Sequence, residues 1–229
     1  MIQRALLWTV AGLVVLVLAW LAWIAGHIAW WKTHPPHETA FMEQRMDTLR
    51  ATNPHAVLRY RWVPYERISD QLKRAMIAAE DAHFIEHEGF DWEGVQAALE
   101  KNQRRGRVVA GGSTITQQLA KNLFLSPARS YWRKFEEAVI TVLLESMLEK
   151  QRIFELYLNV IEWGNGVFGA EAAAQRYFGI AARELNAEQA ARLAAMAPNP
   201  RFYERNQGAP GLSRKIRIII GRMAATPVP

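Results

Sequence analysis

The chain has 229 residues, no cysteine and a formal net charge of +6, and half of its residues are hydrophobic. The lack of cysteine excludes disulfide bonds, a thiol nucleophile and a zinc site built on thiolates, and it leaves the redox compartment open. The length suits one sizeable core, while the basic charge fits nucleic acid, phospholipid headgroups or pyrophosphate without choosing among them.

Residues 1–31 predict a transmembrane anchor. No charged side chain occurs from Ala5 to Trp31, and the stretch from Leu6 to Ile24 is dominated by Leu, Val, Ala and Trp. About 20 such residues span a bilayer as a helix, and the stretch is too long for the apolar part of a signal peptide. We therefore expect an uncleaved, single-pass helix.

The flanking charges orient this anchor only weakly. Arg4 and the amino terminus precede it and Lys32 follows it, so the positive-inside rule slightly favours a cytoplasmic N-terminus. In that orientation the rest of the chain would lie outside the cytoplasm, where it would not meet nucleic acid. The alternative, a buried core helix, would require neighbours that cover Trp8, Trp20 and Trp23 as well as the aliphatic side chains.

Residues 32–66 predict a neck, because they mix Pro, His and polar residues. An alternating run from Val57 to Val63 predicts a lone extended segment within it. From Ser69 onward the hydrophobic period is helical, so residues 67–229 predict one mostly α domain.

Helix signals recur along this domain. A first helix is expected to end at Glu80, with an apolar face made of Leu72, Ala75, Met76 and Ala79. Asp91 predicts the N-cap of a second helix, whose buried face would carry Val95, Ala98 and Leu99. Thr114 and Gln117 form a candidate capping box for a third. Further helices are expected over 130–149, 150–161, 170–177, 186–197 and 212–223.

Two groups of residues could carry chemistry, namely a carboxylate that could act as a base and a set of cations that could hold an anion. Glu80 would be partly buried at the end of an apolar helix, and burial raises the pKa of a carboxyl group. Arg133, Lys134 and Glu137 share one helix face because they lie three and four residues apart. The same spacing fits an exposed ion pair worth roughly 0.2–0.5 kcal/mol, so it does not decide alone.

The segment from His83 to His87 also matches the H-x-x-E-H pattern of an inverted zinc peptidase. That reading needs a helix through both histidines and a third ligand. Gly89 follows closely, and the other histidines all lie upstream in the anchor or the neck, which leaves a carboxylate such as Glu137. We keep this alternative, with histidines that merely cap or line a turn as the simpler one.

Three blocks, taken together, resemble the peptidoglycan glycosyltransferases. The pattern E-D-x-x-F-x-x-H-x-G-x-D occupies residues 80–91, G-G-S-T-I-T-Q-Q-L-A-K-N occupies 111–122, and R-K-x-x-E occupies 133–137. Further similarity lies in Tyr157-Leu158-Asn159 and in Tyr177-Phe178-Gly179. The sequence contains no S-x-x-K and no K-T-G, so the resemblance is to the monofunctional form, and we expect no penicillin-binding domain.

This resemblance implies a mostly α, lysozyme-like glycosyltransferase domain behind the single anchor. The implied reaction polymerises lipid II into wall glycan, with inversion at the anomeric carbon, on the periplasmic side of the bacterial inner membrane. Glu80 is implied as the general base and Glu137 as a second catalytic glutamate, which orients the donor side or a metal. The implied substrate-binding residues are Asp81, Phe84, His87, Thr114, Gln118, Lys121, Asn122, Arg133 and Lys134, of which Lys121, Arg133 and Lys134 would neutralise the leaving pyrophosphate.

The implied partners are lipid II, the nascent glycan chain and membrane lipid, with other cell wall synthesis or division proteins as further candidates and no nucleic acid. The sequence requires no cofactor and leaves room for a divalent ion, Mg or Mn, near the pyrophosphate. Two other classes stay open. A lysozyme-like muramidase would use similar carboxylates without a cationic leaving-group site, and a non-enzymatic wall adaptor would need none of the three blocks.

Overall fold

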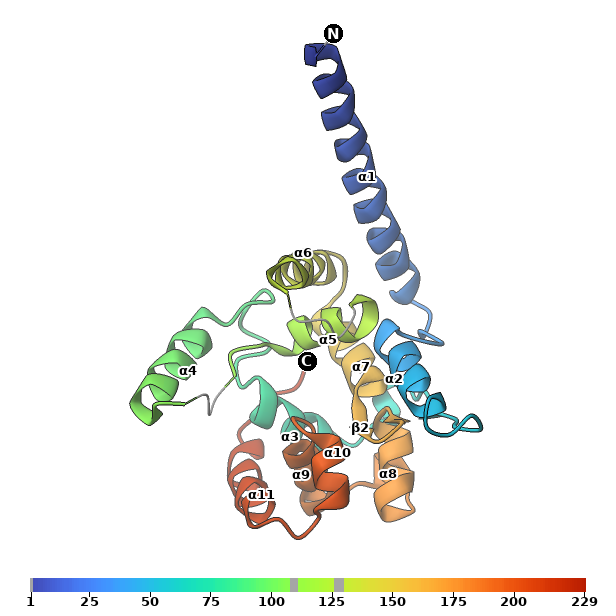
Figure 1. Ribbon diagram of the computed structural model, residues 1–229. Coiled ribbons are helices and arrows are strands. Elements are labelled where there is room, and N and C mark those ends of the chain that lie inside the picture. The colour runs from blue at the N-terminus through green and yellow to red at the C-terminus, as the bar shows by residue number, and fades with distance from the viewer. Residues whose placement is uncertain (1, 108–110, 126–129) are drawn as a thin grey trace.

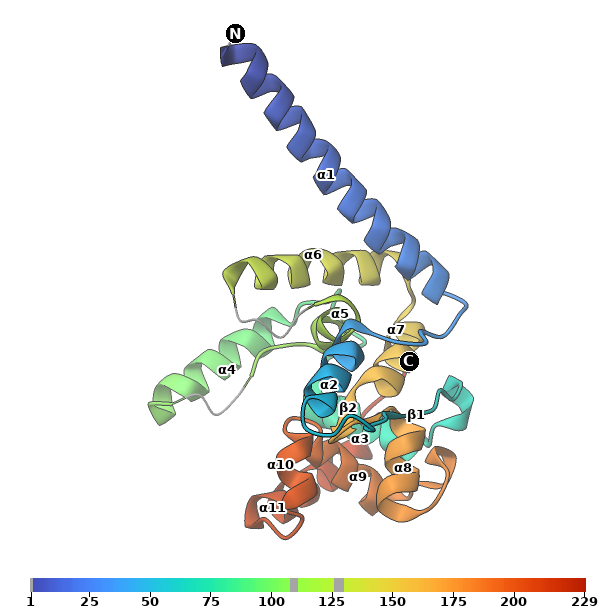
Figure 2. The ribbon, with the colours of Figure 1, turned by 45° about the vertical axis from the view of Figure 1, so that its right-hand side comes forward.

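The computed structural model of the protein describes residues 2–107, 111–125 and 130–229. One long helix, α1 (Ile2–Trp31), projects from a domain made of shorter helices, and α6 (Tyr131–Met147) lies across the top of that domain (Figures 1 and 2). The chain is mostly helical, as predicted.

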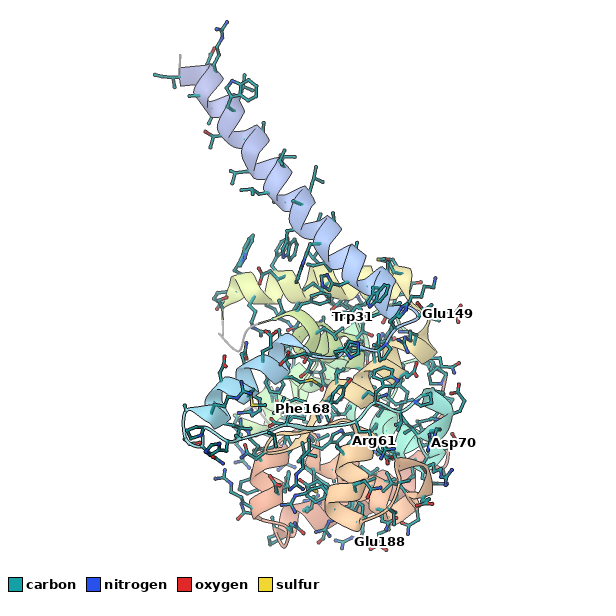
Figure 3. The ribbon with its side chains drawn as sticks, turned by 90° about the vertical axis from the view of Figure 1, so that its right-hand side faces the viewer. Trp31, Arg61, Asp70, Glu149, Phe168 and Glu188 are labelled. Carbon is teal, nitrogen blue, oxygen red and sulfur yellow. The ribbon has the colours of Figure 1, made fainter. Side chains whose placement is uncertain are left out.

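Helix α1 is long and apolar enough to cross a membrane, and in the described part of the chain it alone meets both conditions. Its N-terminal two thirds project freely, whereas its last turns meet the domain near Trp31 (Figure 3). Ile24, Ile28 and Trp31 are buried there, and the rings of Trp23 and Trp31 lie 5.8 and 5.2 Å from that of Phe124. The core-helix alternative is therefore wrong, because Trp8 and most of its aliphatic neighbours are exposed.

The segment after the anchor holds more structure than predicted. It contains α2 (Ala40–Arg50), β1 (Arg59–Tyr60) and the 3₁₀ turn η1 (Tyr65–Arg67), and α2 begins where the Thr39 hydroxyl accepts a hydrogen bond from the Met42 amide. The extended segment is not alone. β1 pairs in parallel with β3 (Val167–Phe168), which also pairs antiparallel with β2 (Glu162–Gly164), in the order β1-β3-β2.

A buried ion pair fastens α2 to this small sheet. Nη2 of Arg45 donates to Oε2 of Glu162 at 3.0 Å, and Nε of the same guanidinium lies 2.7 Å from Oε1. Their side chains are only 8% and 5% exposed. A charge removed from water this far depends on its partner, so the segment before the domain is fixed to the domain rather than merely tethered to it.

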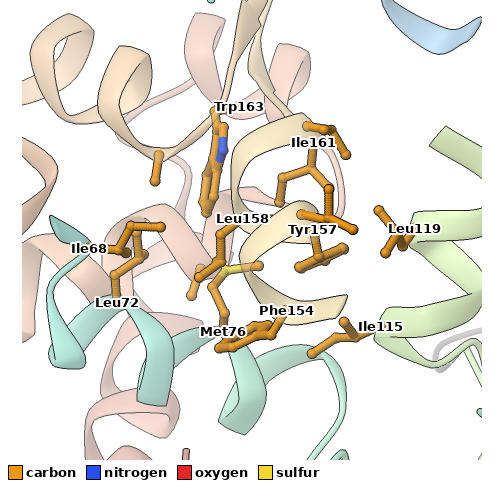
Figure 4. Close-up of a cluster of buried hydrophobic side chains, with 14 of the residues drawn as sticks. Ile68, Leu72, Met76, Ile115, Leu119, Phe154, Tyr157, Leu158, Ile161 and Trp163 are labelled. Atoms are coloured by element: carbon orange, nitrogen blue, oxygen red, sulfur yellow. The ribbon is translucent and has the colours of Figure 1, made fainter. Parts of the chain in front are cut away.

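The core is built around α7 (Lys150–Val160), which is buried on nearly all sides, as expected for a central helix. Phe154, Tyr157 and Leu158 of α7 pack between α3 (Asp70–Glu80) and α5 (Ile115–Phe124) (Figure 4). The first and third predicted helices, α3 and α5, therefore lie on opposite sides of α7 (Figure 4).

The remaining helices follow the predicted order with two corrections. α4 (Trp92–Arg105) buries none of its residues, and Leu99 is 55% exposed, so the apolar stripe that was predicted to be buried is not. Ala79 of α3 is exposed too, because α3 turns its face toward Ile77 and Ala78. The other elements are α8 (Ala170–Phe178), η2 (Ala182–Glu184), α9 (Ala187–Met196), α10 (Pro200–Arg205) and α11 (Pro210–Met223).

Replacing Arg45 with Met should lower the free energy of unfolding by about 3 kcal/mol, because it leaves the Glu162 carboxylate buried without its principal partner. Denaturation of the detergent-solubilised protein measures this loss. The matched control is Arg104→Met, which breaks an exposed pair with Glu100 and should cost less than about 0.5 kcal/mol. Equal losses in the two variants would show that the buried pair contributes nothing specific.

Candidate active site

Glu80 is the last residue of α3, and a chain of hydrogen bonds holds its carboxylate. The Gln118 amide on α5 donates to Glu80 Oε2 at 2.9 Å, and the Tyr157 hydroxyl on α7 donates to Gln118 Oε1 at 3.1 Å. Three helices thus fix one carboxylate. Gln118 was predicted among the substrate-binding residues, whereas the contribution of Tyr157 was not foreseen.

The environment of Glu80 makes it a better base than an ordinary glutamate. Burial raises the pKa of its carboxyl group, and the charge of Asp81 raises it further. The hydrogen bond from Gln118 and the charges of Lys215 and Lys121 act in the opposite direction without cancelling the rise. A carboxylate with a raised pKa accepts a proton more readily, which is what general base catalysis requires.

Asp81, the next residue, joins the end of α3 to the start of α5. Its buried carboxylate accepts a hydrogen bond from the Ile115 amide at 2.9 Å, in the first turn of α5. Nε2 of His87 lies 2.9 Å from the other oxygen. Both residues were predicted to shape or bind substrate. Their polar atoms are engaged inside the protein, so they shape the site by positioning Glu80 and α5.

Thr114 and Gly89 make the second joint between these blocks. Thr114 forms the predicted capping box with Gln117, and its hydroxyl also donates to the Gly89 carbonyl at 2.7 Å. Gly89 has a φ of +89°, and a Cβ there would lie 2.7 Å from Cγ2 of Thr141 on α6. Glycine is therefore required at this position by both backbone conformation and space.

The predicted cationic cluster forms where α5 faces α6. Arg133 Nη1 lies 3.1 Å from Glu137 Oε2, and Lys134 Nζ is ion-paired with the other oxygen of the same carboxylate. Glu137 is buried, with a side chain only 4% exposed. The simple reading, an exposed pair on a solvated face, is therefore wrong for the carboxylate, although Lys134 itself is half exposed.

Lys121 completes the cluster from the facing helix. Partial desolvation by the surrounding protein lowers the pKa of Lys121, although its side chain is accessible. The charges of Arg133 and Lys134 lower the pKa further, and those of Glu137 and Glu80 raise it. A lysine whose charge is disfavoured by neighbouring cations gains most from an arriving anion.

A cleft of about 530 Å³ connects these groups. Gln118, Lys121, Asn122, Arg133 and Tyr157 line one part of it, and Phe41 and residues 198–201 line the other. Asn122 is held by a hydrogen bond to the Gln118 carbonyl. The structure thus brings Gln118, Lys121 and Asn122 of the second block and Arg133 of the third to one cavity, and Gln118 connects it to Glu80.

Glu80 also borders two smaller hollows, of about 180 and 160 Å³. One is lined by residues 111–114, and both include Arg222 of α11, with Lys215 in the second. Neither cation was predicted. Their spacing of seven residues puts them on one helical face, a signal that is visible in the sequence but common on any amphipathic helix.

Phe84 and His83 are placed differently from these groups. Phe84 is fully buried against the ring of Phe154 on α7, so it belongs to the core and not to the lining of the cleft. The His83 side chain is half exposed and lies 3.3 Å from Asp91, the N-cap of α4. Residues 82–89 form turns and bends, not a helix, so the zinc peptidase pattern lacks the element that it needs.

No cluster of three or more metal-binding side chains occurs in the described ranges. Glu137, the carboxylate nearest the predicted pyrophosphate site, has both oxygens engaged by Arg133 and Lys134. This donor set does not fit a divalent ion held by the protein.

Comparison with known proteins agrees with this geometry. A family described as Transglycosylase matches residues 47–224, which begins within α2. The biosynthetic peptidoglycan transglycosylase of Dechloromonas aromatica is 62% identical over 95% of this chain and 94% of its own length. The chain belongs to the transglycosylase family. Proteins of the same name from Chromobacterium violaceum and Azoarcus sp. are 56% and 60% identical, over 99% and 93% of this chain and 100% and 92% of their own.

Membership of this family confirms the predicted fold class, a mostly α, lysozyme-like glycosyltransferase domain behind a single N-terminal apolar helix. It also confirms that the protein is a glycosyltransferase of peptidoglycan polymerisation. The muramidase and the non-enzymatic adaptor are thereby set aside. The transglycosylase keeps its charged groups on helices that the core fixes rigidly.

The two histidines of the first block should respond differently to substitution. His87→Ala removes a partner of the buried Asp81 carboxylate and should lower the free energy of unfolding by about 1–3 kcal/mol, with loss of polymerising activity. His83→Ala alters a half-exposed side chain and should preserve both. Thermal unfolding and a glycan polymerisation assay compare the pair. Loss of activity in the His83 variant with unchanged unfolding would give His83 a role that this geometry does not explain.

Proposed function

We propose that this transglycosylase polymerises lipid II by transferring the growing, lipid-linked chain to the 4-hydroxyl of an incoming lipid II, with Glu80 as the general base. The observation that carries the proposal is the position of Glu80. Its carboxylate has a raised pKa and borders the hollows lined by Arg222, and it is held by Gln118, which lines the same cleft as Lys121 and Arg133.

The chemistry follows from this arrangement. The Glu80 carboxylate takes the proton of the acceptor 4-hydroxyl as its oxygen forms a bond to the anomeric carbon of the donor. The bond from that carbon to the pyrophosphate breaks on the opposite face, so the anomeric centre inverts. Inverting glycosidases use the same in-line geometry, with water in place of the sugar hydroxyl.

The cationic cluster suits the leaving pyrophosphate. Lys121, Arg133 and Lys134 supply three positive charges against the one carboxylate of Glu137. Nε of Arg133 is buried without a hydrogen-bond partner, and a phosphate oxygen would satisfy it. Cations that are already in position stabilise the charge as it develops, which lowers the barrier instead of merely tightening binding. Glu137 would orient Arg133 and Lys134 toward that charge.

This mechanism takes no step through a metal, because both oxygens of Glu137 are occupied. The donor pyrophosphate would lie in the cation-lined cleft and the acceptor sugar beside residues 111–114, on the other side of Glu80. Asp81, His87 and Thr114 would position Glu80 and α5 and would not contact the substrate.

The anchor supports a location at the bacterial inner membrane, with the domain on the periplasmic side. There the lipid-linked substrate and product share the bilayer with α1, and membrane lipid surrounds the helix. Other proteins of wall synthesis or division are further candidate partners. The transglycosylase would work beside them on the same strand.

Purified transglycosylase incubated with labelled lipid II should produce a polymer that a muramidase then digests. Glu80→Gln should abolish this product without unfolding the domain, because glutamine keeps the shape and cannot accept the proton. In the wild type, kcat should fall as pH is lowered through the raised pKa of Glu80, at a higher pH than for an ordinary glutamate. Near-normal turnover by the glutamine variant would rule out Glu80 as the base.

Lys134→Ala tests the leaving-group site. Since Lys134 is half exposed, its removal should hardly change the melting temperature, yet kcat at saturating lipid II should fall by about tenfold or more as the developing charge loses a partner. Arg183→Ala is the control, because it removes an exposed cation that is paired, among the described residues, with Glu184 alone, and it should leave kcat unchanged. If Lys134→Ala also left kcat unchanged, its pair with Glu137 would be merely structural.

A further inference from the structure

A further hollow, of about 430 Å³, adjoins the cation-lined cleft and is lined by four arginines; we call it the arginine pocket. Arg59 comes from β1, Arg176 from α8, and Arg201 and Arg205 from α10. Arg201 borders the cleft as well, so the two cavities share a wall. The mechanism above uses none of these four side chains.

The charge of this arginine pocket is not balanced by its surroundings. Its one lining carboxylate, Glu204, already accepts hydrogen bonds from the Asn165 amide at 2.7 Å and from Arg176 at 3.4 Å. Arg201 lies 3.9 Å from Glu162, whose carboxylate is bound more closely by Arg45. Within the described residues, neither Arg59 nor Arg205 forms an ion pair.

The backbone that carries these arginines is held in place. The Arg59 amide donates to the Gly166 carbonyl at 2.8 Å as β1 pairs with β3, and the Tyr177 hydroxyl of α8 donates to the Trp163 carbonyl at 2.8 Å. The Arg205 side chain donates to the Arg201 carbonyl at 3.2 Å. This backbone places the guanidinium groups around one hollow, and their planar fork suits a carboxylate.

The position of the pocket selects among anions. α8 and α10, which carry three of the four arginines, lie at the end of the domain opposite α1 (Figures 1 and 2). With α1 in the bilayer, lipid headgroups stay at the α1 end, and the diphosphate of the donor is placed beside Lys121 and Arg133. A strand leaving the cleft past Arg201 would bring sugars with their peptide branches, which carry free carboxylates.

We propose that the arginine pocket binds a peptide carboxylate of the nascent glycan strand and holds the strand between successive additions. The proposal rests on the function proposed above, because it places the strand in the adjoining cleft. Two guanidinium groups without acidic partners make charge-assisted hydrogen bonds to one carboxylate, the strong class of such bonds. Retention of the strand would raise the number of sugars added before release.

The test pairs a double variant with two substrates. Arg59→Gln with Arg205→Gln alters exposed side chains outside the catalytic cluster, and lipid II is supplied either with free peptide carboxylates or with these converted to amides. The wild type should make strands about tenfold longer from the acidic substrate than from the amidated one. The double variant should make short strands from both, with an unchanged melting temperature and unchanged kcat on the amidated substrate.

A matched control, Arg183→Gln with Arg214→Gln, removes the same charge from exposed positions elsewhere and should behave as the wild type does. Equal shortening in this control, or a wild type that is indifferent to amidation, would overturn the proposal. Binding of short soluble glycan strands with acidic peptides is measured in parallel and should weaken about tenfold in the double variant. If the wild type made no polymer at all, the proposed function would fail, and this binding measurement would still decide the pocket.

Discussion

The contact between the end of α3 and the start of α5 is the constraint on which the site depends. The Asp81 carboxylate accepts from the Ile115 amide, and Thr114 bonds to the Gly89 carbonyl, so the first two sequence blocks are fixed to each other. Once these ends are joined, Glu80 faces Gln118, and Lys121 follows one turn later on the same helix. Much of the charge in the first block thus serves placement and not chemistry.

The site combines two electrostatic environments that are kept apart by a few residues. On one side burial makes Glu80 a stronger base, and on the other the crowded cations favour an incoming anion. Neither environment is stable in isolation, since a buried acid and a set of neighbouring cations both cost free energy. The packed core around α7 offsets that cost, because α3 and α5, which carry Glu80 and Lys121, both pack against it (Figure 4).

Local signals in the sequence predicted local structure well. The Asp91 cap, the box of Thr114 with Gln117 and the end of α3 are each set by a few neighbouring residues, and the structure contains all of them. The pairing of β1 with β3 joins segments far apart in the chain, so no local pattern reveals it. Periodicity predicted α4 but not its surroundings, because an apolar stripe does not say what covers it. For the site, resemblance supplied the residues of α5 and α6, whereas Lys215 and Arg222 approach Glu80 only through the packing of α11.

The junction of α1 with the domain has a mechanical consequence. α1 is one continuous helix to Trp31, and its last turns pack against Phe124, three residues beyond Lys121. An enzyme on a flexible tether explores a sphere of positions, whereas with α1 in the membrane, as proposed above, this junction would carry the cleft at a set height above the bilayer surface. The reach of the enzyme would then be a thin layer, and a lipid-linked sugar would be within that layer only if its diphosphate stood at the level of the cleft. Selection by height would act before any selection by affinity.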